Sequence, residues 1–349
     1  MRVQRLSGGG RFRSAAEAVA SFGAVQAQEF AEVKWSLAER MVGEPTDAEL
    51  DAAFDRGEMI RTHILRPTWH FVTPEDLGWM LELSAPRVHQ ANKGPYRQMG
   101  LEQNLLERSA DAIARALSDG EPKLRKELAV ALAEEGINVE GMALGYVVHF
   151  AELEGVVCSG PRRGKQQTYM LVADRVPKTA ERSREDSLAE LARRYFGGHG
   201  PGTLRDFSWW SGLTQSDCRE AVEQAGDDVA PLDIGDERDW FGAPRPSRVP
   251  KRTGTHLIPM YDELGVAFRD LRIVCAAPPP EGMMARPILI DGVTVGSWKR
   301  TFAKRRVIVE ATLLRKLGST EGDELAETVA RFGRFLELDA QLETRLVSG

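Results

Sequence analysis

The sequence repeats one order of predicted elements three times before its pattern changes. In each of three segments, amphipathic helical stretches precede a pair of short runs in which apolar and polar residues alternate. These paired runs are MIRTHIL with TWHFV, VVCSG with QTYMLV, and VAPLDI with RDWFG. A helical period followed by a period of two predicts helices that lead into a β-hairpin. Helices that end in such a β wing are the plan of a winged helix, a variant of the helix-turn-helix.

The pattern changes after the proline- and arginine-rich hinge APRPSRVPKR. The later runs ARPILIDGVTVGSWKRT and RRVIVEATLL alternate around turn dipeptides such as Asp291-Gly292, which predicts strands of a small sheet or barrel. An amphipathic stretch from Glu321 to Leu346 predicts a closing helix. The expected fold class is therefore α+β, with three tandem winged-helix units and a small C-terminal β-barrel. The expected units are winged helices at 1–73, 118–176 and 186–245, a helical connector at 74–117 with a break at 92–95, a barrel at 250–318 and a last helix at 319–349.

Composition bounds the class of protein. With 349 residues, of which 42% are hydrophobic, the chain is long enough for two or three domains with sizeable cores. Its net charge of −6 argues against attraction of the whole molecule to nucleic acid, so a nucleic-acid site has to be a local basic face. Three cysteines without a CxxC pair predict a reducing compartment. Because the sequence shows neither a signal peptide nor an apolar run of membrane-spanning length, we expect a soluble cytoplasmic protein without membrane contacts.

Clusters of basic residues occur in the second predicted wing, in the hinge and near the C-terminal hairpin. A helix-turn-helix unit places a helix in the major groove of DNA, although winged helices also serve as protein-interaction modules. A solvated face is the simplest interpretation of each cluster, and we keep it for the hinge. The stretch SWKRTFAKRR is denser and lies beside a predicted turn, which favours contacts with phosphates. The candidate DNA-contacting residues of the second wing and of this stretch are Arg162, Arg163, Lys165, Trp298, Lys299, Arg300 and Lys304.

Motifs of several common catalytic sites are missing. The chain has no GxGxxG, GxxxxGKS or GxxxxGKT phosphate cradle and no GxSxG elbow. It has no HExxH and no Cys/His cluster with the spacing of a metal site, and two histidines, His63 and His70, are too few for one. We therefore expect neither a metal ion nor a cofactor.

Two glutamines lie two residues apart in the segment GAVQAQE. Ser14 and Glu17 predict the capped start of a helix that Gly23 ends, so we expect Gln26 and Gln28 to follow in an extended segment. On a helix their side chains would diverge by about 200°, whereas in an extended chain they point the same way. Taken alone, the segment favours a plainer interpretation, in which Gln26 caps a helix and Gln28 faces solvent.

The order of five motifs resembles that of one family. GAVQAQE, RTHILRPTWHFV, GTLRDFSWWSGL, LIPMYDELGVAFRD and IDGVTVGSWKRT extend across nearly the whole length of the chain. In these motifs the sequence resembles the AlkZ-like winged-helix DNA glycosylases. The resemblance implies three tandem winged helices and a β-barrel that form a C-shaped body around DNA. It also implies a monomeric, monofunctional enzyme that hydrolyses the N-glycosidic bond of N7-alkylated purines in double-stranded DNA, in some members at interstrand crosslinks, without a metal or cofactor.

The resemblance also implies site residues. Its Gln-hydrophobic-Gln catalytic motif matches Gln26-Ala27-Gln28, with alanine as a small hydrophobe. Glu29 is the rival, since a carboxylate there could act as a base or an electrostatic stabiliser, or simply start the next helix. His63 and His70 in the first wing, together with Arg66 between its strands, are candidates for lining a lesion pocket.

Two other functions fit the same elements. A non-catalytic DNA-binding or damage-sequestering protein could use the same scaffold, and the acidic net charge and the lack of a titratable residue in the motif favour it. A winged-helix transcription regulator is the third hypothesis, but it leaves the long region of predicted strands without a purpose.

Overall fold

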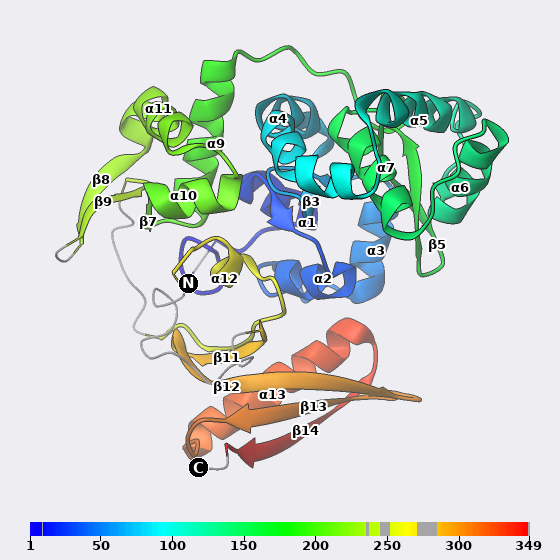
Figure 1. The fold of residues 1–349 in the computed structure, drawn as a ribbon. Helices are drawn as coiled ribbons and strands as arrows, with labels where there is room; N and C mark the ends of the chain where they lie inside the picture. Colours follow the sequence, from blue (N-terminus) through cyan, green and yellow to red (C-terminus); the bar gives the residue numbers. More distant parts are fainter. Residues whose placement is uncertain (9, 235–236, 245–251, 271–284, 348–349) are drawn as a thin grey trace.

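Figure 1 shows the computed structural model, which describes residues 1–8, 10–234, 237–244, 252–270 and 285–347. Most of the predicted hinge, with Arg245, Arg248 and Lys251, lies outside these residues, as does Cys275. The other two cysteines, Cys158 and Cys218, are free thiols in the interior. No helix in the part of the chain that the structure describes is long and apolar enough to cross a membrane.

The first unit packs three helices around a three-stranded sheet. Ser14 caps the first helix by accepting a hydrogen bond from the Glu17 backbone, as predicted, and Thr46 with Glu49 forms a capping box on the third. The sheet order is β1-β3-β2, with antiparallel pairs throughout. The elements are α1 (Ala15–Phe22), β1 (Val25–Gln26), α2 (Phe30–Ala38), α3 (Asp47–Asp55), β2 (Ile60–His63) and β3 (Trp69–Val72).

The second and third units repeat this sheet order. Their sheets run β4-β6-β5 and β7-β9-β8, so a short first strand pairs each time with the second strand of the predicted hairpin. The three hairpins are confirmed, and the short first strand is the addition that the sequence did not reveal. The second unit contains β4 (Lys123–Leu124), α6 (Arg125–Glu134), α7 (Gly141–Leu153), β5 (Val157–Arg163), β6 (Gln166–Leu171) and α8 (Val172–Arg175). The third contains α9 (Arg184–Gly198), β7 (Gly202–Thr203), α10 (Leu204–Ser211), α11 (Gln215–Ala225), the 3-10 turn η1 (Gly226–Asp228), β8 (Ala230–Ile234) and β9 (Glu237–Gly242).

The connector consists of α4 (Pro74–Gln98) and α5 (Gln103–Ala116), and the break predicted at 92–95 is wrong. Pro95 removes one backbone hydrogen bond, but it lies in the last turn of α4, where that loss matters least. Packing holds the turn, because the buried Asn92 side chain donates to the Tyr96 hydroxyl, and Tyr96 packs against aromatic residues of α7.

The C-terminal region is an open sheet rather than the predicted barrel. Its five strands run in the order β10-β11-β12-β13-β14, and among the described residues the two edge strands do not pair with each other. The predicted closing helix is also too long, because α13 ends at Leu336 and the chain returns as a strand parallel to β13. The predicted turn at Asp291-Gly292 is confirmed, with φ of 50° and 81°. The elements are β10 (Thr255–Leu257), α12 (Glu263–Val266), β11 (Pro287–Ile290), β12 (Val293–Ala303), β13 (Arg306–Leu313), α13 (Ser319–Leu336) and β14 (Asp339–Leu346).

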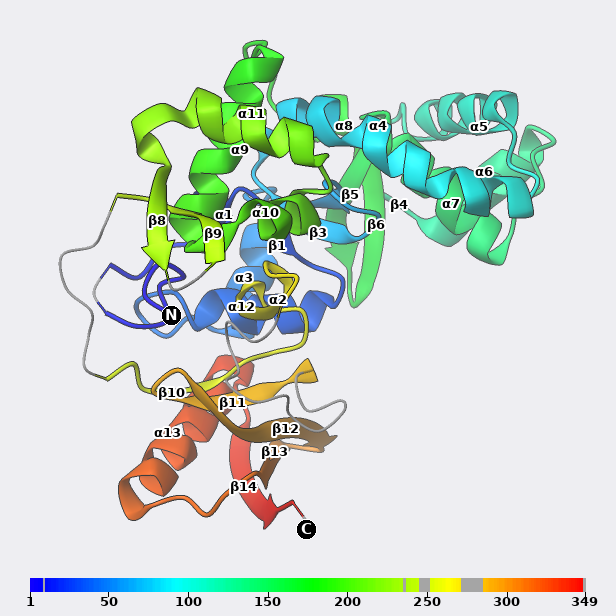
Figure 2. The same ribbon diagram turned by 60° about the vertical axis from the view of Figure 1, so that its left-hand side comes forward.

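The C-terminal sheet shares a hydrophobic core with the first unit. Trp35 of α2 is buried there and donates its indole N–H to the Leu257 carbonyl at 2.8 Å. The chain then leaves the sheet after β10 and reaches α12, which lies between the sheet and the helical units in both ribbon views (Figures 1 and 2). This short helix contacts β1, and it therefore carries residues of the C-terminal region to the Gln-x-Gln segment.

Candidate active site

In the Gln26-Ala27-Gln28 segment, Gln26 lies in the extended strand β1, as predicted, whereas Gln28 follows in a bend that leads to α2. Gln26 pairs with His70 across the β1–β3 ladder, and the Ala27 N–H donates to the Trp69 carbonyl at 2.7 Å. Helix α2 starts only at Phe30. The interpretation of Gln26 as a helix cap is therefore wrong, since it belongs to a strand and Gln28 is half-buried.

Three charged side chains hold this segment from different sides. Glu263 accepts the Gln26 backbone N–H at 2.6 Å. Arg61 donates its Nε to the carbonyl of Ala27 at 2.9 Å and an Nη to that of Gln28 at 3.2 Å. Arg66 donates an Nη to the side-chain Oε1 of Gln26 at 2.7 Å. The position of the glutamines is thus fixed through both their backbone and a side chain.

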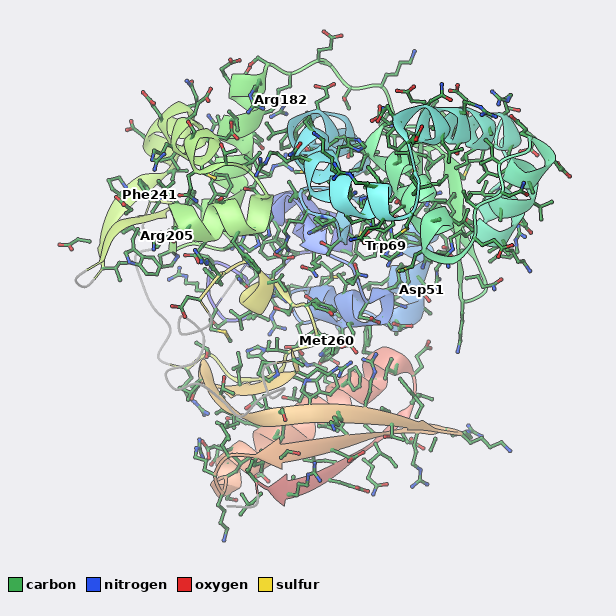
Figure 3. The ribbon with its side chains drawn as sticks, viewed as in Figure 1. Asp51, Trp69, Arg182, Arg205, Phe241 and Met260 are labelled. Carbon is green, nitrogen blue, oxygen red and sulfur yellow. The ribbon has the colours of Figure 1, made fainter. Side chains whose placement is uncertain are left out.

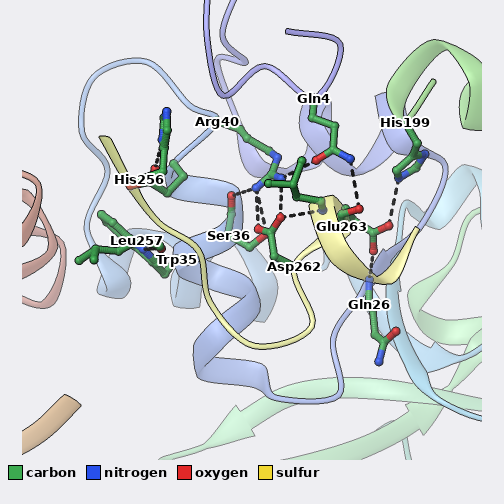
Figure 4. Close-up of polar contacts among 12 residues, drawn as sticks. Gln4, Gln26, Trp35, Ser36, Arg40, His199, His256, Leu257, Asp262 and Glu263 are labelled. Carbon is green, nitrogen blue, oxygen red and sulfur yellow. Dashed lines mark hydrogen bonds and ion pairs between the residues drawn. The ribbon is translucent and has the colours of Figure 1, made fainter. Parts of the chain in front are cut away.

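Glu263 comes from the first turn of α12, whose start is built by its neighbour. Asp262 caps the helix by accepting the Leu264 N–H, and it is held in turn by two hydrogen bonds from Arg40 and one from Ser36 (Figure 4). Burial disfavours a charge on Asp262. The charge and hydrogen bonds of Arg40, with those from Ser36 and the Leu264 N–H, together outweigh burial and lower the pKa of that carboxyl. The bonds of Asp262 to Arg40 and Ser36 therefore dock α12 onto the C-terminal end of α2 and leave Glu263 facing β1.

A cavity of about 660 Å³ opens beside Gln26. Most of its walls are apolar, and its polar groups include the amide of Gln26 and the guanidinium of Arg66. Trp209 and Tyr261, both at least 40% exposed, are large aromatic residues of its lining. Met260, which Figure 3 labels, lines the cavity from the loop that leads into α12. Further lining residues are Ile258, Leu264, Val266, Phe268 and Leu289.

The predicted lesion-pocket residues lie around the same strands. His63 is directly opposite Trp69 in the β2–β3 ladder, so the turn preserves their shared face and the rings are 4.4 Å apart. Burial, with Arg61 nearby, lowers the pKa of His63 to about 3. His70 is fully buried, donates Nδ1–H to the Thr68 carbonyl, and has no partner for Nε2 among the described residues. Arg66 lines the cavity, whereas His63 faces a second one.

That second cavity, of about 470 Å³, shares Pro67 with the first and is also lined by Trp69. His63 forms a hydrogen bond there with Glu152 of α7 and stacks on His149 at 3.7 Å between ring centres. Burial raises the pKa of Glu152 to about 8 and lowers that of His149 to about 3. Burial therefore favours a protonated Glu152 at neutral pH, hydrogen-bonded to Nδ1 of a neutral His63.

Several of the predicted DNA-contacting side chains are buried or paired with carboxylates. Trp298, expected near a DNA groove, is only 1% exposed and donates to the Ile258 carbonyl, so its assignment as a DNA contact is wrong. Its place in β12 turns it toward α13, where Phe332 packs against it. Arg300 is paired with the buried Glu32.

The second wing is similarly neutralised. Arg162 is paired with Asp51 and Asp55, and Arg163 with Glu127. Arg163 is nonetheless exposed, as are Lys165 in the second wing, Lys299 on β12, and Lys304 at the tip of the β12–β13 hairpin.

Several residues of the site were not found from the sequence. Arg61, Glu152 and Glu263 touch the segment or its immediate supports, although none of them was assigned a role from the sequence. Arg61 and Glu263 lie inside two of the five family motifs. The signal that could have found Glu263 is the pair Asp262-Glu263 directly after the run LIPMY, because buried carboxylates need partners. Among the described residues, no three or more His, Cys, Asp or Glu side chains come together as a metal-ion site.

Comparisons with known proteins show the family and the fold of the chain. The family model described as DNA glycosylase AlkZ-like matches residues 19–335. The chain belongs to the AlkZ-like DNA glycosylases. A curated relative of this family, the interstrand DNA cross-link repair glycosylase of Streptomyces sahachiroi, is 24% identical over 308 residues, which are 82% of either chain. The solved structure of Streptomyces sahachiroi DNA glycosylase AlkZ superposes with a TM-score of 0.78 at 20% identity, over 99% of this chain and 96% of that one. This AlkZ-like chain therefore has the mixed α/β fold of that enzyme.

Proposed function

We propose that the protein hydrolyses the N-glycosidic bond of N7-alkylated purines in double-stranded DNA, at bulky adducts or interstrand crosslinks. The observation that carries the proposal is the Gln-x-Gln segment, clamped by three charged residues beside a large apolar cavity. We further propose that the three helix-and-wing units and the C-terminal sheet hold DNA as a C-shaped monomer in the cytoplasm, with each of the three units acting as a winged helix.

The chemistry explains why neutral amides suffice. An N7-alkylated purine already carries a positive charge, so it leaves as a neutral base when the electron pair of the glycosidic bond moves onto it. No acid is required. The sugar becomes cationic, water adds to it, and one proton passes to solvent. What remains for the protein is to orient that water and to present fixed dipoles to the cationic sugar.

Both amides keep acceptor capacity for this task. A carbonyl oxygen has two lone pairs, and Arg66 uses one on Gln26, while the Trp69 N–H uses one on Gln28 at 3.3 Å. The second lone pair and the NH2 group of each amide can hold a water. Amides stabilise a cation less than carboxylates do, so this site favours labile, already cationic lesions and spares normal purines.

Glu29, the rival to the two glutamines, is less suited to the reaction. Its side chain is exposed at the start of α2 and makes no capping hydrogen bond to the helix. Gln26, by contrast, is 7% exposed and lines the cavity. A buried amide orients its dipole more firmly than a mobile, solvated carboxylate.

The size of the cavity supports bulky adducts. Its 660 Å³ falls in the range of about 300–1,000 Å³ that is usual for small-molecule sites, far more than a methyl group fills. Its exposed aromatic residues can stack on a planar substituent. The crosslink activity named for the Streptomyces sahachiroi relative supports the same class of lesion.

Base release from defined oligonucleotides tests the proposal. One duplex carries N7-methylguanine, a second a bulky N7 adduct and a third an N7 crosslink, and alkali then cleaves the abasic sites. Cleavage of all three indicates a broad repair enzyme, and cleavage of the bulky lesions alone a more selective one. No cleavage together with tight binding indicates the sequestering protein. Unchanged release by the Gln26→Ala/Gln28→Ala double variant would remove the two amides from the mechanism.

A further inference from the structure

A fully buried carboxylate lies directly behind Gln26. Glu263 has no exposed side-chain surface, and its Oε1 accepts the Gln26 backbone N–H at 2.6 Å. Its Oε2 accepts two further N–H groups at 3.0 Å, from Nε2 of His199 and the indole of Trp210. The carboxylate thus joins β1 of the first unit to α9 and α10 of the third.

These donors keep Glu263 ionised. Burial by itself disfavours the charge, but the hydrogen bond and charge of His199 and the N–H of Gln26 outweigh it and lower the pKa. The backbone of its own residue is also fixed, because the Gln4 side chain donates to the Glu263 carbonyl at 3.1 Å. The negative charge therefore has a defined place.

The negative charge of Glu263 also offsets the positive charge of Arg66. Its guanidinium touches the Gln26 amide, and burial lowers the pKa of Arg66 while the carboxylate of Glu263 opposes this effect. A lone guanidinium at the amide would repel both a cationic base and a cationic sugar. A carboxylate on the other side of the same residue offsets that repulsion.

We infer that Glu263 is a positioning residue for base excision: it anchors the backbone of Gln26 and balances the charge of Arg66, so that the Gln26 amide meets a cationic sugar in a neutral setting. The inference rests on the proposed role of Gln26 and adds a residue 237 positions away in the sequence. Glu263 acts through Gln26, and it needs no contact with DNA.

Two substitutions separate the anchor from the charge. Glu263→Gln removes the charge and leaves a single oxygen for the three N–H groups that the carboxylate accepts. Glu263→Asp keeps the charge beside His199 and Trp210 but draws the oxygen back by one bond from Gln26. We expect each to lower the single-turnover rate of N7-methylguanine release at least about tenfold, since small misplacements at a reacting centre cost up to about a hundredfold. The dissociation constant for the same DNA is expected to stay within about threefold.

Glu39→Gln is the matched control. Glu39 is equally buried and bonds a histidine and an arginine, His256 and Arg331, but it faces the C-terminal sheet and α13. Its substitution removes a buried charge from a comparable setting and should leave the release rate of the remaining folded enzyme unchanged. Comparable loss of rate in this control would mean that general destabilisation, rather than position, is measured.

Amide hydrogen exchange supplies a readout that does not depend on activity. The Gln26 N–H is expected to exchange slowly in the wild type and at least about tenfold faster in Glu263→Asp, while the neighbouring Ala27 N–H changes less. Unchanged exchange at Gln26, or either variant releasing base at the wild-type rate, would overturn the inference; the aspartate variant decides if the glutamine variant does not fold. A wild type that releases no base would instead refute the proposed function, and exchange would still test the anchor.

Discussion

Two buried carboxylates flank the Gln-x-Gln segment, and they differ in ionisation. Glu263 bonds a histidine of the third unit and receives three N–H groups, and its pKa is lowered. Glu152 forms hydrogen bonds with the side chains of His63 and Trp69, and burial raises its pKa to about 8. Both are out of solvent, so burial does not distinguish them. The difference teaches that the number of donors around a buried carboxyl decides whether it holds charge.

The largest expected effect is on stability. Glu263→Gln leaves at least one of three buried donors unpaired and removes an ionic partner of His199, so we expect a loss of about 3 kcal/mol in the free energy of unfolding. Glu152→Gln replaces a protonated carboxyl with an amide whose N–H can still donate to His63, and should cost less than about 1 kcal/mol. Urea unfolding of both variants at pH 7 makes the comparison. Equal losses would contradict the assigned difference in ionisation.

The second effect is a pH dependence confined to the Glu152 side. Its carboxyl binds a proton up to about pH 8 in the folded chain but only to about 4.5 when unfolded, so its stabilisation is complete below 4.5 and is lost as pH rises through 8. From pH 6.5 to 9 this amounts to about 2 kcal/mol. The buried histidines are neutral in the folded chain and titrate near pH 6.5 when unfolded, so they make stability rise slightly with pH at the low end of this range. A Glu152→Gln variant keeps these histidines, so comparison with the wild type cancels their contribution.

Chemical unfolding of wild type and Glu152→Gln across this range measures it. The difference in unfolding free energy between the two should shift in favour of the variant as pH rises. A difference that stays constant would show that Glu152 is already ionised at neutral pH.

The third effect concerns the glutamines themselves. Gln26 lies on the Glu263 side and lines the large cavity, whereas Gln28 turns its carbonyl toward the Trp69 backbone. We expect each alanine substitution to lower single-turnover base release at least about tenfold, the low end for one lost oriented dipole, with the greater loss at Gln26. Rates on the N7-methylguanine duplex, with circular dichroism as the check on folding, decide this. A greater loss at Gln28 would move the reacting centre toward the Glu152 side.

Features that depend on nearby residues were predictable from the sequence, whereas contacts between residues far apart in the chain were not. The helices, the three hairpins and the extended strand of Gln26 depend on local spacing, caps and turns, and these were predictable. The partners of Gln26 were not, because Glu263 and Arg66 meet it only through the fold. The predicted DNA contact of Trp298 was wrong for a related reason. A tryptophan within a basic run suggests an exposed side chain, but the face of the strand on which it lies decides whether it is buried.

The smallest expected effect extends the lesson about partners to the surface. Arg163 and Lys304 are both predicted DNA contacts, but Arg163 is paired with Glu127 while Lys304 lies exposed at the tip of the longest hairpin. A cation that contacts phosphate releases about one counterion, so Lys304→Gln should lower the slope of log affinity against log salt by about one. Arg163→Gln should change it less, because its charge is already balanced and Glu127 is left behind. Fluorescence anisotropy of duplex DNA at several salt concentrations distinguishes them. If both variants show the same slope of log affinity against log salt, the hairpin tip does not contact DNA. The position of a basic residue in the sequence would then not predict a DNA contact without knowledge of its acidic neighbours.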